Sequence, residues 1–257
     1  MKPEYVSVSV AQSAAGLRLI APRAIPSPWS EAVKGMLTVC DLPWLGIYLD
    51  QKDEQQFAWS GRRDAPVLFD QQQAPLHHWR DIMLRLQQLS ASDRLLPEDK
   101  KMRQQVLTWC GFFADPQGLG WYRRLLGVKR GLAGERGGYS PGISHYLGKK
   151  YGYQQQHDGH YEGWVVERLQ QLAQQLRQQQ KLNSHYLIGQ RLTAADIYCA
   201  AFSALFSPLP ESQCAMLAPL RQVFEYLSDA EQQALDPLVL QHRDYIYQHY
   251  LSLPLSL

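Results

Sequence analysis

Residues 17–36 read LRLIAPRAIPSPWSEAVKGM, and their pattern is the main indication of the fold class. Its first five residues form a short apolar run that ends at Pro22, which is typical of a buried β-strand. After the loop RAIPSPWS, apolar side chains recur between residues 32 and 40 at the spacing of one helix face. The sequence therefore predicts a strand, a loop and a helix in immediate succession.

More elements of the same kind follow. Residues 45–49 (LGIYL) and 65–69 (APVLF) are apolar and β-prone, and residues 74–76 are placed to pair with the second run as a hairpin. A helical stripe then occupies residues 79–89. The order strand, helix, strand, hairpin, helix predicts a small α/β domain over residues 17–90.

The remainder of the chain is predicted to be an all-helical domain over residues 98–257, joined to the first by a polar linker at 91–97. The glutamine-rich segment 165–176 keeps a helical apolar period, which indicates a long helix with a solvated face. The glycine-rich segment 127–142 is predicted to be a loop.

Residues 1–16 are expected to be an N-terminal extension. Within it Val6, Val8 and Val10 alternate with serines, a pattern that suits a short edge strand. The whole chain has 257 residues, close to twice the roughly 150 of a typical domain, which agrees with two domains.

Composition limits the classes of function. With 45% hydrophobic and 19% charged residues, the chain is not a mainly disordered protein. A net charge of +2 gives no electrostatic case for binding nucleic acid. No stretch approaches the roughly 20 apolar residues of a membrane span, and the N-terminus lacks the apolar core of a signal peptide. We therefore expect a soluble, cytoplasmic protein that does not bind membranes.

The four cysteines have no CxxC pair and no zinc-finger spacing, and the histidines are scattered, so no metal site is expected. In a chain of this length we expect buried free thiols rather than a disulfide framework.

The first candidate site is Ser27-Pro28-Trp29-Ser30, between the first strand and the first helix. A side chain at a helix N-terminus meets unpaired N–H groups and a dipole that favours negative charge. Redox enzymes place a C-P-x-C pair here because the thiolate is stabilised. Serine at both positions excludes disulfide exchange, but a hydroxyl can donate a hydrogen bond to a thiolate that a ligand brings. Spacing alone favours a plain helix cap, with Ser27 as N-cap and Pro28 in the first turn.

The second candidate is the segment 186–197, YLIGQRLTAADI. Thr193 and Asp196 have the spacing of a capping box, in which the hydroxyl and the carboxylate each bond a backbone amide of the same helix end. Apolar residues then follow at helical spacing. This motif indicates a folding device at the start of a buried helix rather than a catalytic site.

Together these segments resemble the glutathione transferase family over residues 17–257. LRLIAP followed by SPWSEAVKGM is similar to the first strand and helix of its thioredoxin-like domain, and APVL resembles the segment that carries a cis proline. YLIGQRLTAADIY is similar to the capping motif in the buried helix of its helical domain. The resemblance implies a thioredoxin-like α/β domain followed by an all-α domain, and it is strongest to a bacterial subgroup without a defined substrate.

The resemblance also implies site residues. Ser27 is the expected catalytic residue, whose hydroxyl stabilises the thiolate of glutathione, and Ser30 is the second candidate. Glutathione, as co-substrate, is expected to contact Trp29 and to form β-type hydrogen bonds with the backbone of Val67, after a cis Pro66. The implied reaction transfers the thiol to an electrophilic carbon of a second substrate, and the implied assembly is a homodimer.

One position departs from the family pattern. Glutathione transferases usually carry an acidic residue followed by serine shortly before the next helix, and counting back from Ile82 these positions hold His78 and Trp79. Neither side chain reproduces a carboxylate facing an ammonium group. The γ-glutamyl end is then held differently, with His78 and Trp79 as the candidate contacts, or glutathione binding is weak, or the ligand is another thiol or acid. The alternative function is a non-catalytic binding protein of the same fold that has lost the usual glutathione site.

The second substrate is expected between the domains, against the first helices of the C-terminal part. Aromatic residues there serve either as a ligand wall or as core. The candidates are Trp109, Phe113, Trp121 and Tyr122.

Overall fold

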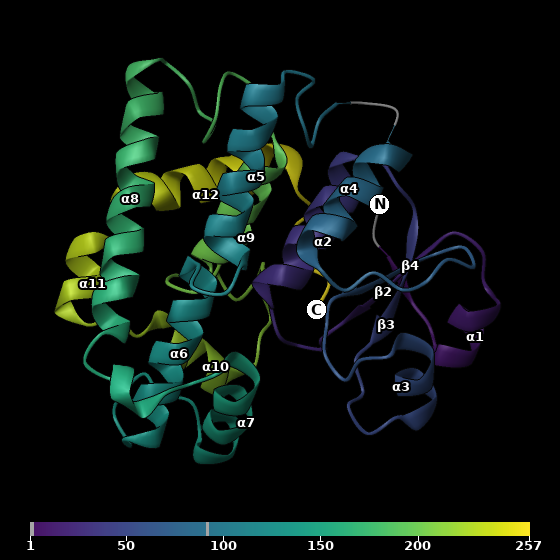
Figure 1. Ribbon diagram of the computed structural model, residues 1–257, viewed down its shortest axis with the longest axis horizontal. Coiled ribbons are helices and arrows are strands. Elements are labelled where there is room, and N and C mark those ends of the chain that lie inside the picture. Colours follow the sequence, from purple (N-terminus) through teal and green to yellow (C-terminus); the bar gives the residue numbers. More distant parts are fainter. Residues whose placement is uncertain (1–2, 91–92) are drawn as a thin grey trace.

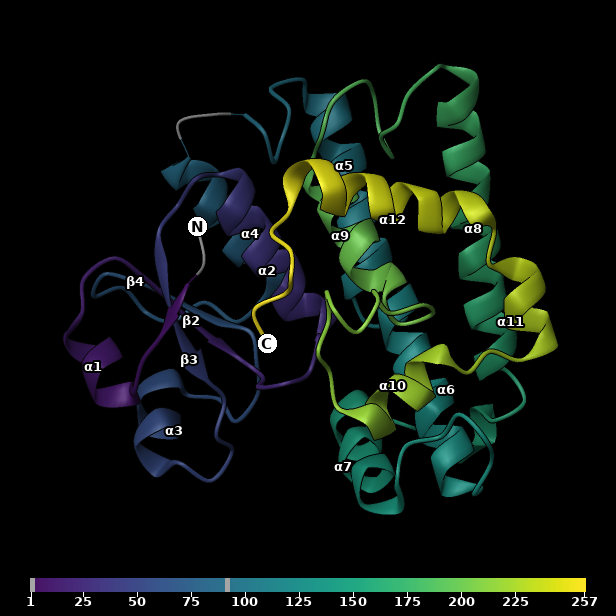
Figure 2. The same ribbon diagram turned by 180° about the vertical axis from the view of Figure 1, so that it is seen from behind.

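The computed structural model describes residues 3–90 and 93–257 of the chain. The polypeptide forms a sheet half and a helical half that lie side by side (Figures 1 and 2). The first two residues of the expected extension, and residues 91 and 92 of the expected linker 91–97, lie outside the described residues.

The sheet half is built on four strands in the order β1-β3-β2-β4. Strand β2 pairs in parallel with β3 and antiparallel with β4. An isolated bridge joins Leu68 to Leu76, as the predicted hairpin requires. The strands are β1 (Glu4–Tyr5), β2 (Leu17–Ala21), β3 (Trp44–Tyr48) and β4 (Val67–Asp70).

The N-terminal prediction was partly wrong. An edge strand exists, but it is β1, which pairs with β3 at Glu4 and Tyr5. The valine alternation instead leads into a helix, α1 (Val8–Ser13), because the Ser7 hydroxyl accepts a hydrogen bond from the Val10 amide and begins a turn. The polar segment after β3 contains a further short helix, α3 (Glu54–Ser60).

Helix α4 (Trp79–Leu89) has the bounds that the apolar spacing predicted. Helix α2 (Pro28–Val39) contains the predicted apolar face but begins earlier, inside the segment RAIPSPWS that was predicted to be a loop. The apolar faces of the two helices pack on each other and on the sheet, and α2 also packs against α9 (Ala194–Ser203) of the helical half. Gly35 allows that close approach, because a Cβ atom there would lie 2.6 Å from Cγ2 of Ile197. One continuous hydrophobic core therefore spans both halves.

The helical half consists of seven further α-helices around α9 and one short 3-10 helix in the part of the chain that the structure describes. They are α5 (Lys100–Ala114), α6 (Leu119–Leu132), α7 (Pro141–Tyr151), η1 (Gln155–His157), α8 (Tyr161–Lys181), α10 (Ala218–Glu225), α11 (Asp229–Ala234) and α12 (Pro237–Tyr250).

The prediction of a loop over residues 127–142 was wrong at both ends, since α6 continues to Leu132 and α7 begins at Pro141. Two glycines of α6 serve packing rather than flexibility. A Cβ at Gly127 would lie 2.6 Å from the Tyr139 ring, and one at Gly131 would lie 2.3 Å from the Tyr139 carbonyl oxygen. The chain that returns after α6 therefore lies directly on the helix.

The capping box predicted at Thr193 and Asp196 is present. The Asp196 carboxylate accepts from the Thr193 amide at 2.8 Å and the Thr193 hydroxyl at 3.0 Å. All four cysteines are buried and free, as predicted. No helix among the described residues is long and apolar enough to cross a membrane.

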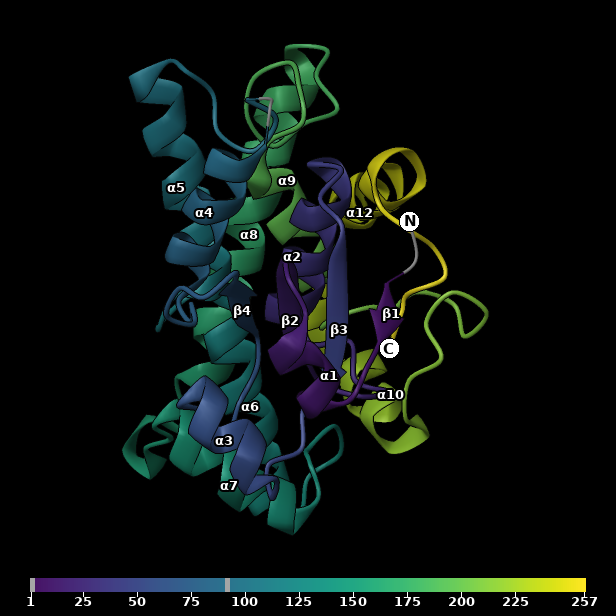
Figure 3. The same cartoon turned by 90° about the vertical axis from the view of Figure 1, so that its right-hand side faces the viewer.

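The C-terminal segment returns to the sheet half and ends near β1 (Figure 3). The Ser256 carbonyl accepts hydrogen bonds from Lys34 Nζ at 2.6 Å and from the Tyr5 hydroxyl at 3.1 Å. The Tyr48 hydroxyl donates to the Leu257 carbonyl at 3.2 Å.

Candidate active site between the two halves

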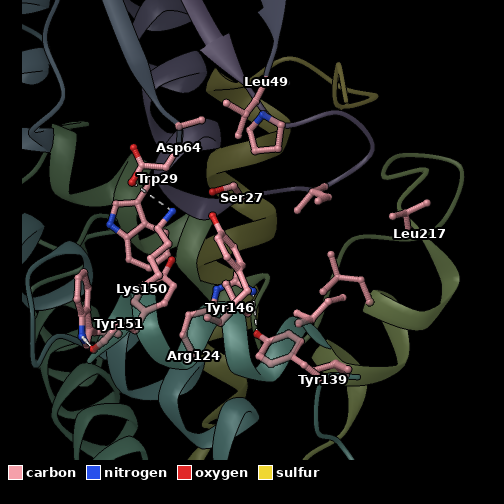
Figure 4. A pocket seen from close by; sticks show the side chains of 18 of the residues that line it. Ser27, Trp29, Leu49, Asp64, Arg124, Tyr139, Tyr146, Lys150, Tyr151 and Leu217 are labelled. Carbon is pink, nitrogen blue, oxygen red and sulfur yellow. Dashed lines mark hydrogen bonds and ion pairs between the residues drawn. The ribbon is translucent and has the colours of Figure 1, made fainter. Parts of the chain in front are cut away.

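A cavity of about 1640 Å³ lies where the sheet half meets the helical half. Its walls come from the loop before α2, the segments before β4 and α4, and helices α6, α7 and α10. Ligand pockets usually measure about 300–1000 Å³. This cavity therefore has room for two small molecules side by side, and Figure 4 shows part of its lining.

Ser27 lies at the start of α2 and faces this cavity (Figure 4). It occupies the N-cap position with Pro28 in the first turn, yet its side chain makes no capping hydrogen bond. The backbone amide of Glu31 bonds the Ser27 carbonyl at 2.8 Å, so the backbone begins the helix without the hydroxyl. The hydroxyl at the positive end of the helix dipole is therefore available to a ligand.

The other two predicted residues of the motif lie differently. Trp29 lines the cavity and is fixed by a hydrogen bond from Nε1 to the Ala114 carbonyl at 3.1 Å. Ser30 is 0% exposed, does not line the cavity, and its Oγ has no hydrogen-bond partner among the described residues. Of the two serines, only Ser27 is placed to touch a molecule in the cavity.

The peptide bond between Ala65 and Pro66 is cis, as the resemblance implied, and both residues line the cavity. Val67 is 0% exposed and is not among the lining residues. The amide and carbonyl of Leu68 both bond Leu76, at 2.9 and 2.8 Å. Because successive residues of an antiparallel strand direct their backbone groups to opposite sides, those of Val67 point to β2, opposite Ile20.

Val67 therefore has its backbone groups committed to the sheet. Ala65, on the other side of the cis proline, is the neighbouring residue that lines the cavity. The sequence carried the signal for this segment in APVL, but only the register distinguishes the two residues that flank Pro66.

The start of α4 presents three aromatic side chains to the cavity, His77, His78 and Trp79. His78 is the N-cap, and its Nδ1 accepts from the Arg80 amide at 3.3 Å. Burial and the nearby Arg62 lower the pKa of His77, so this ring is neutral at neutral pH. No acidic side chain stands at the two positions where the family pattern has its acid and serine.

A carboxylate nevertheless lies beside them. Asp115, at the end of α5, lines the same part of the cavity and accepts a hydrogen bond from Trp79 Nε1. Asp115 comes from the helical half, more than thirty residues later in the chain, and no motif in the sequence pointed to it.

One carboxylate on the cavity wall is shared by two cations. Asp64 Oδ1 lies 3.1 Å from Arg62 Nε, and Asp64 Oδ2 lies 3.4 Å from Lys150 Nζ on α7. Burial alone would raise the pKa of Asp64, but hydrogen bonds and charge from Arg62 and Lys150 outweigh it and lower the pKa. Burial lowers the pKa of Lys150, with the charges of Arg124 and Arg62 acting in the same direction. Positive charge thus exceeds negative charge at this wall.

Similarity to known proteins is found in the structure and not in the sequence. No protein-family model matches the sequence, and no curated protein matches it significantly. Among solved structures, a glutathione S-transferase from Methylobacillus flagellatus KT with glutathione bound superposes with a TM-score of 0.62 at 15% identity, covering 91% of this chain and 96% of that one. A glutathione transferase family member from Pseudomonas fluorescens Pf-5 with two glutathione bound gives 0.55 at 17%, covering 91% and 94%.

The chain has the fold of the glutathione transferases. The similarity extends over nearly the whole of both chains, which confirms the expected α/β thioredoxin-like half followed by an all-helical half. A third match, Ure2p in complex with glutathione, has a TM-score of 0.55 at 14% identity and covers 89% of this chain and 98% of that one.

In this glutathione transferase fold the predicted aromatic residues of the second-substrate region are separated. Trp121 lines the cavity, and its Nε1 donates to the Tyr151 carbonyl at 2.9 Å. Trp109, Phe113 and Tyr122 are absent from the lining: Phe113 is core, Trp109 packs on it, and Tyr122 packs on Trp164.

The aromatic wall that the structure has instead comes mainly from α7 and the loop before it. Sequence analysis missed these residues because the glycine-rich segment was predicted to be a loop, and the turn that brings α7 onto α6 was not recognised in it. They are Tyr139, Tyr146 and Tyr151.

Proposed function

We propose that the protein is a glutathione transferase, which binds glutathione in the cavity and transfers its thiol to an electrophilic carbon of a second substrate. The observation that carries the proposal is the Ser27 hydroxyl, which lies at the N-terminus of α2, makes no capping bond, and faces a cavity that also contains a cis proline. Solved structures of the same fold that contain glutathione support it.

Ser27 would act by donating its hydroxyl proton in a hydrogen bond to the sulfur anion. A hydrogen bond to a charged group contributes about 1.5–3 kcal/mol, which corresponds to roughly a 10- to 100-fold larger thiolate population. The unpaired amides at the start of α2 add a favourable dipole. Glutathione supplies the nucleophile: its sulfur forms the new bond to carbon while the leaving group departs with the electron pair.

The remaining parts of the tripeptide have matching groups in the cavity wall. The backbone of Ala65, which lines the cavity, would pair with the cysteinyl unit by strand addition. The N-terminus of α4, an eleven-residue helix, suits the γ-glutamyl carboxylate, and Asp115 beside it suits the ammonium group. Asp115 would then bind the ammonium group in place of the acidic residue that the family pattern has at the position of His78.

Two serine-to-alanine substitutions test the assignment of Ser27. We expect Ser27→Ala to lower the rate of glutathione conjugation to 1-chloro-2,4-dinitrobenzene about 10- to 100-fold. The pKa of bound glutathione, followed by thiolate absorbance against pH, should rise in the same variant. Ser30→Ala is the matched control, because Ser30 does not line the cavity, and it should change the rate less than twofold. Equal rates for wild type and Ser27→Ala would remove Ser27 from the mechanism.

A second function is favoured by His78 and Trp79. If the Asp115 carboxylate accepts only the hydrogen bond from the Trp79 indole and binds no ammonium group, the protein is a non-catalytic binding protein of this fold. Calorimetry with glutathione separates the two proposals. Binding that weakens at least tenfold in Asp115→Asn supports the transferase, and no heat at millimolar glutathione supports the binding protein.

The proposal includes two features that rest on the family resemblance, a homodimeric assembly and a cytoplasmic location. It also divides the chain at the linker, into residues 17–90 and 98–257. Light scattering on the purified protein tests the assembly, and a mass of one chain would contradict it.

A further inference from the structure

Arg124 is a buried cation with no acidic partner in the part of the chain that the structure describes. It lies on α6, is 6% exposed and lines the cavity. Its neighbours on the same helix, Arg123 and Arg130, both pair with the buried carboxylate of Glu231. In the described ranges 3–90 and 93–257, no carboxylate forms an ion pair with Arg124, and its Nε atom has no hydrogen-bond partner.

The groups around Arg124 hold it without neutralising it. Its Nη1 donates to the Tyr139 hydroxyl at 2.8 Å, and its guanidinium lies 5.1 Å from the centre of the Phe224 ring. Burial lowers the pKa of Arg124, but the hydroxyls of Tyr139 and Tyr151 more than offset this, so it stays charged. A buried charge that is not paired is unfavourable, and an anion entering the cavity would relieve that penalty.

Two other cations strengthen the same field. Lys150 and Arg62 share the single carboxylate of Asp64, so these three groups and Arg124 carry three positive charges against one negative charge. Figure 4 shows Ser27 on the opposite side of the cavity from Arg124, with Tyr146 between them. An anion at Arg124 would thus lie across the cavity from the proposed sulfur site.

The walls between these two points are aromatic and apolar. Tyr146 and Tyr151 lie beside Arg124, and Ile143 and Leu147 of α7 also line the cavity. A ligand that fits both features has a flat apolar body and one carboxylate, because a guanidinium binds a carboxylate with two parallel hydrogen bonds.

We propose that Arg124 is the specificity-determining residue of the second-substrate site and selects acceptors that carry a carboxylate on an aromatic body. The inference rests on the proposed function only in calling the ligand an acceptor. The carboxylate-binding site itself would stand if glutathione did not bind.

The test compares a carboxylate with its neutral counterpart on the wild-type protein in the absence of glutathione. Calorimetric titration should give at least tenfold tighter binding of 2-naphthoate than of 2-naphthamide, since the two differ in charge and not in their ring. Equal affinities would overturn the proposal, and this measurement needs no variant to fold.

Variants then assign the effect to Arg124. Arg124→Met should weaken 2-naphthoate about 10- to 100-fold and leave 2-naphthamide within twofold. Arg136→Met is the matched control, because Arg136 lines the same cavity but is exposed and stacks on Tyr226. An unchanged preference for 2-naphthoate over 2-naphthamide in Arg124→Met would overturn the assignment.

If Arg124→Met does not fold, Lys150→Met at a more exposed position takes its place. It should weaken the binding of 2-naphthoate about threefold or more, and an unchanged preference for 2-naphthoate in this variant would then overturn the assignment.

Glutathione has carboxylates of its own, and a separate titration distinguishes that source. Glutathione should bind Arg124→Met within threefold of wild type, while 2-naphthoate loses its affinity. A parallel loss for glutathione would show that Arg124 binds the tripeptide and would overturn the proposal. No heat with glutathione in any variant would contradict the proposed function alone.

Discussion

Asp196 is a fully buried carboxylate surrounded by donors from three parts of the chain. Besides the capping bonds from Thr193, it accepts from the Leu187 amide at 2.6 Å and lies 3.0 Å from His242 Nε2 on α12. The capping motif visible in the sequence therefore also joins the segment before α9 and the C-terminal helix. Removing the carboxylate leaves several buried polar groups without partners.

We expect Asp196→Ala to lower the free energy of unfolding by about 3–5 kcal/mol. Asp99→Ala is the matched control, because Asp99 also caps a helix with its carboxylate, at 2.8 Å from the Met102 amide, but at an exposed position. That control should cost about 1 kcal/mol. Urea unfolding measures both, and similar losses would contradict the joining role of Asp196. If Asp196→Ala does not fold, Asp196→Asn provides the comparison.

The ion pair of His242 with Asp196 predicts a pH dependence of stability. Burial lowers the pKa of His242, but the Cys199 sulfur and the Asp196 carboxylate outweigh it and raise the pKa from 6.5 to about 10. A raised folded pKa contributes stability that is complete below the unfolded pKa of 6.5 and disappears as the pH rises toward 10. The difference in unfolding free energy between wild type and His242→Gln should therefore shrink between pH 6.5 and 10. A difference that grows over this range would contradict the raised pKa.

At the scale of elements, the contact between α2 and α9 depends on the absence of a side chain at Gly35. Alanine in a helix is more favourable than glycine by up to about 1 kcal/mol. At Gly35 the added Cβ would meet Ile197, and such overpacking costs about 1–3 kcal/mol. A Cβ atom added at Gly163 on α8 would meet no heavy atom of another described residue within 4 Å, so alanine there brings only the gain in helix propensity.

We therefore expect Gly163→Ala to stabilise the protein and Gly35→Ala to destabilise it, measured by thermal and urea unfolding. The double variant Gly35→Ala with Ile197→Ala should show coupling, because the smaller side chain removes the clash. Equal stabilisation by the two single substitutions would contradict close packing of α2 on α9.

The elements that the sequence predicted correctly are those with a local signal. The apolar periods of β2, α2 and α4 and the capping spacing at Thr193 depend on neighbouring residues, and the structure confirms them. Gly127 led to the wrong prediction of a loop, because it permits close contact with Tyr139 and no local pattern reveals such a contact.

The same distinction applies to the candidate site. Ser27 and Pro66 were found because they lie in short motifs at element boundaries. Asp115, Arg124 and Tyr139 come from the helical half, and they reach the cavity only through the packing of that half against the sheet. The choice of Ala65 rather than Val67 as the residue that meets glutathione follows from the strand register, which the hairpin sets. Contacts that depend on tertiary packing were therefore beyond sequence analysis.

At the scale of the whole molecule, the two halves are held together by more than the α2–α9 contact. After α12 the chain crosses back to the sheet, where residues 252–257 lie against α2 and β1. Lys34 on α2 is nearly buried, pairs with Glu31 at 2.8 Å, and donates to the Ser256 carbonyl. The last residues thus complete the surroundings of a buried ion pair in the sheet half, far from them in sequence.

Deletion of residues 252–257 should therefore destabilise the sheet half as well as the C-terminus. The loss of hydrogen bonds from Tyr5, Lys34 and Tyr48, at about 1 kcal/mol each, predicts a decrease of about 2–4 kcal/mol in unfolding free energy. Ser256→Ala is the matched control, because backbone carbonyls accept the three bonds, which should survive it. Hydrogen exchange should show faster exchange in β1 and α2 of the deletion variant, since Ser256 bonds both elements. Faster exchange confined to α12 would mean that the returning segment does not connect the two halves.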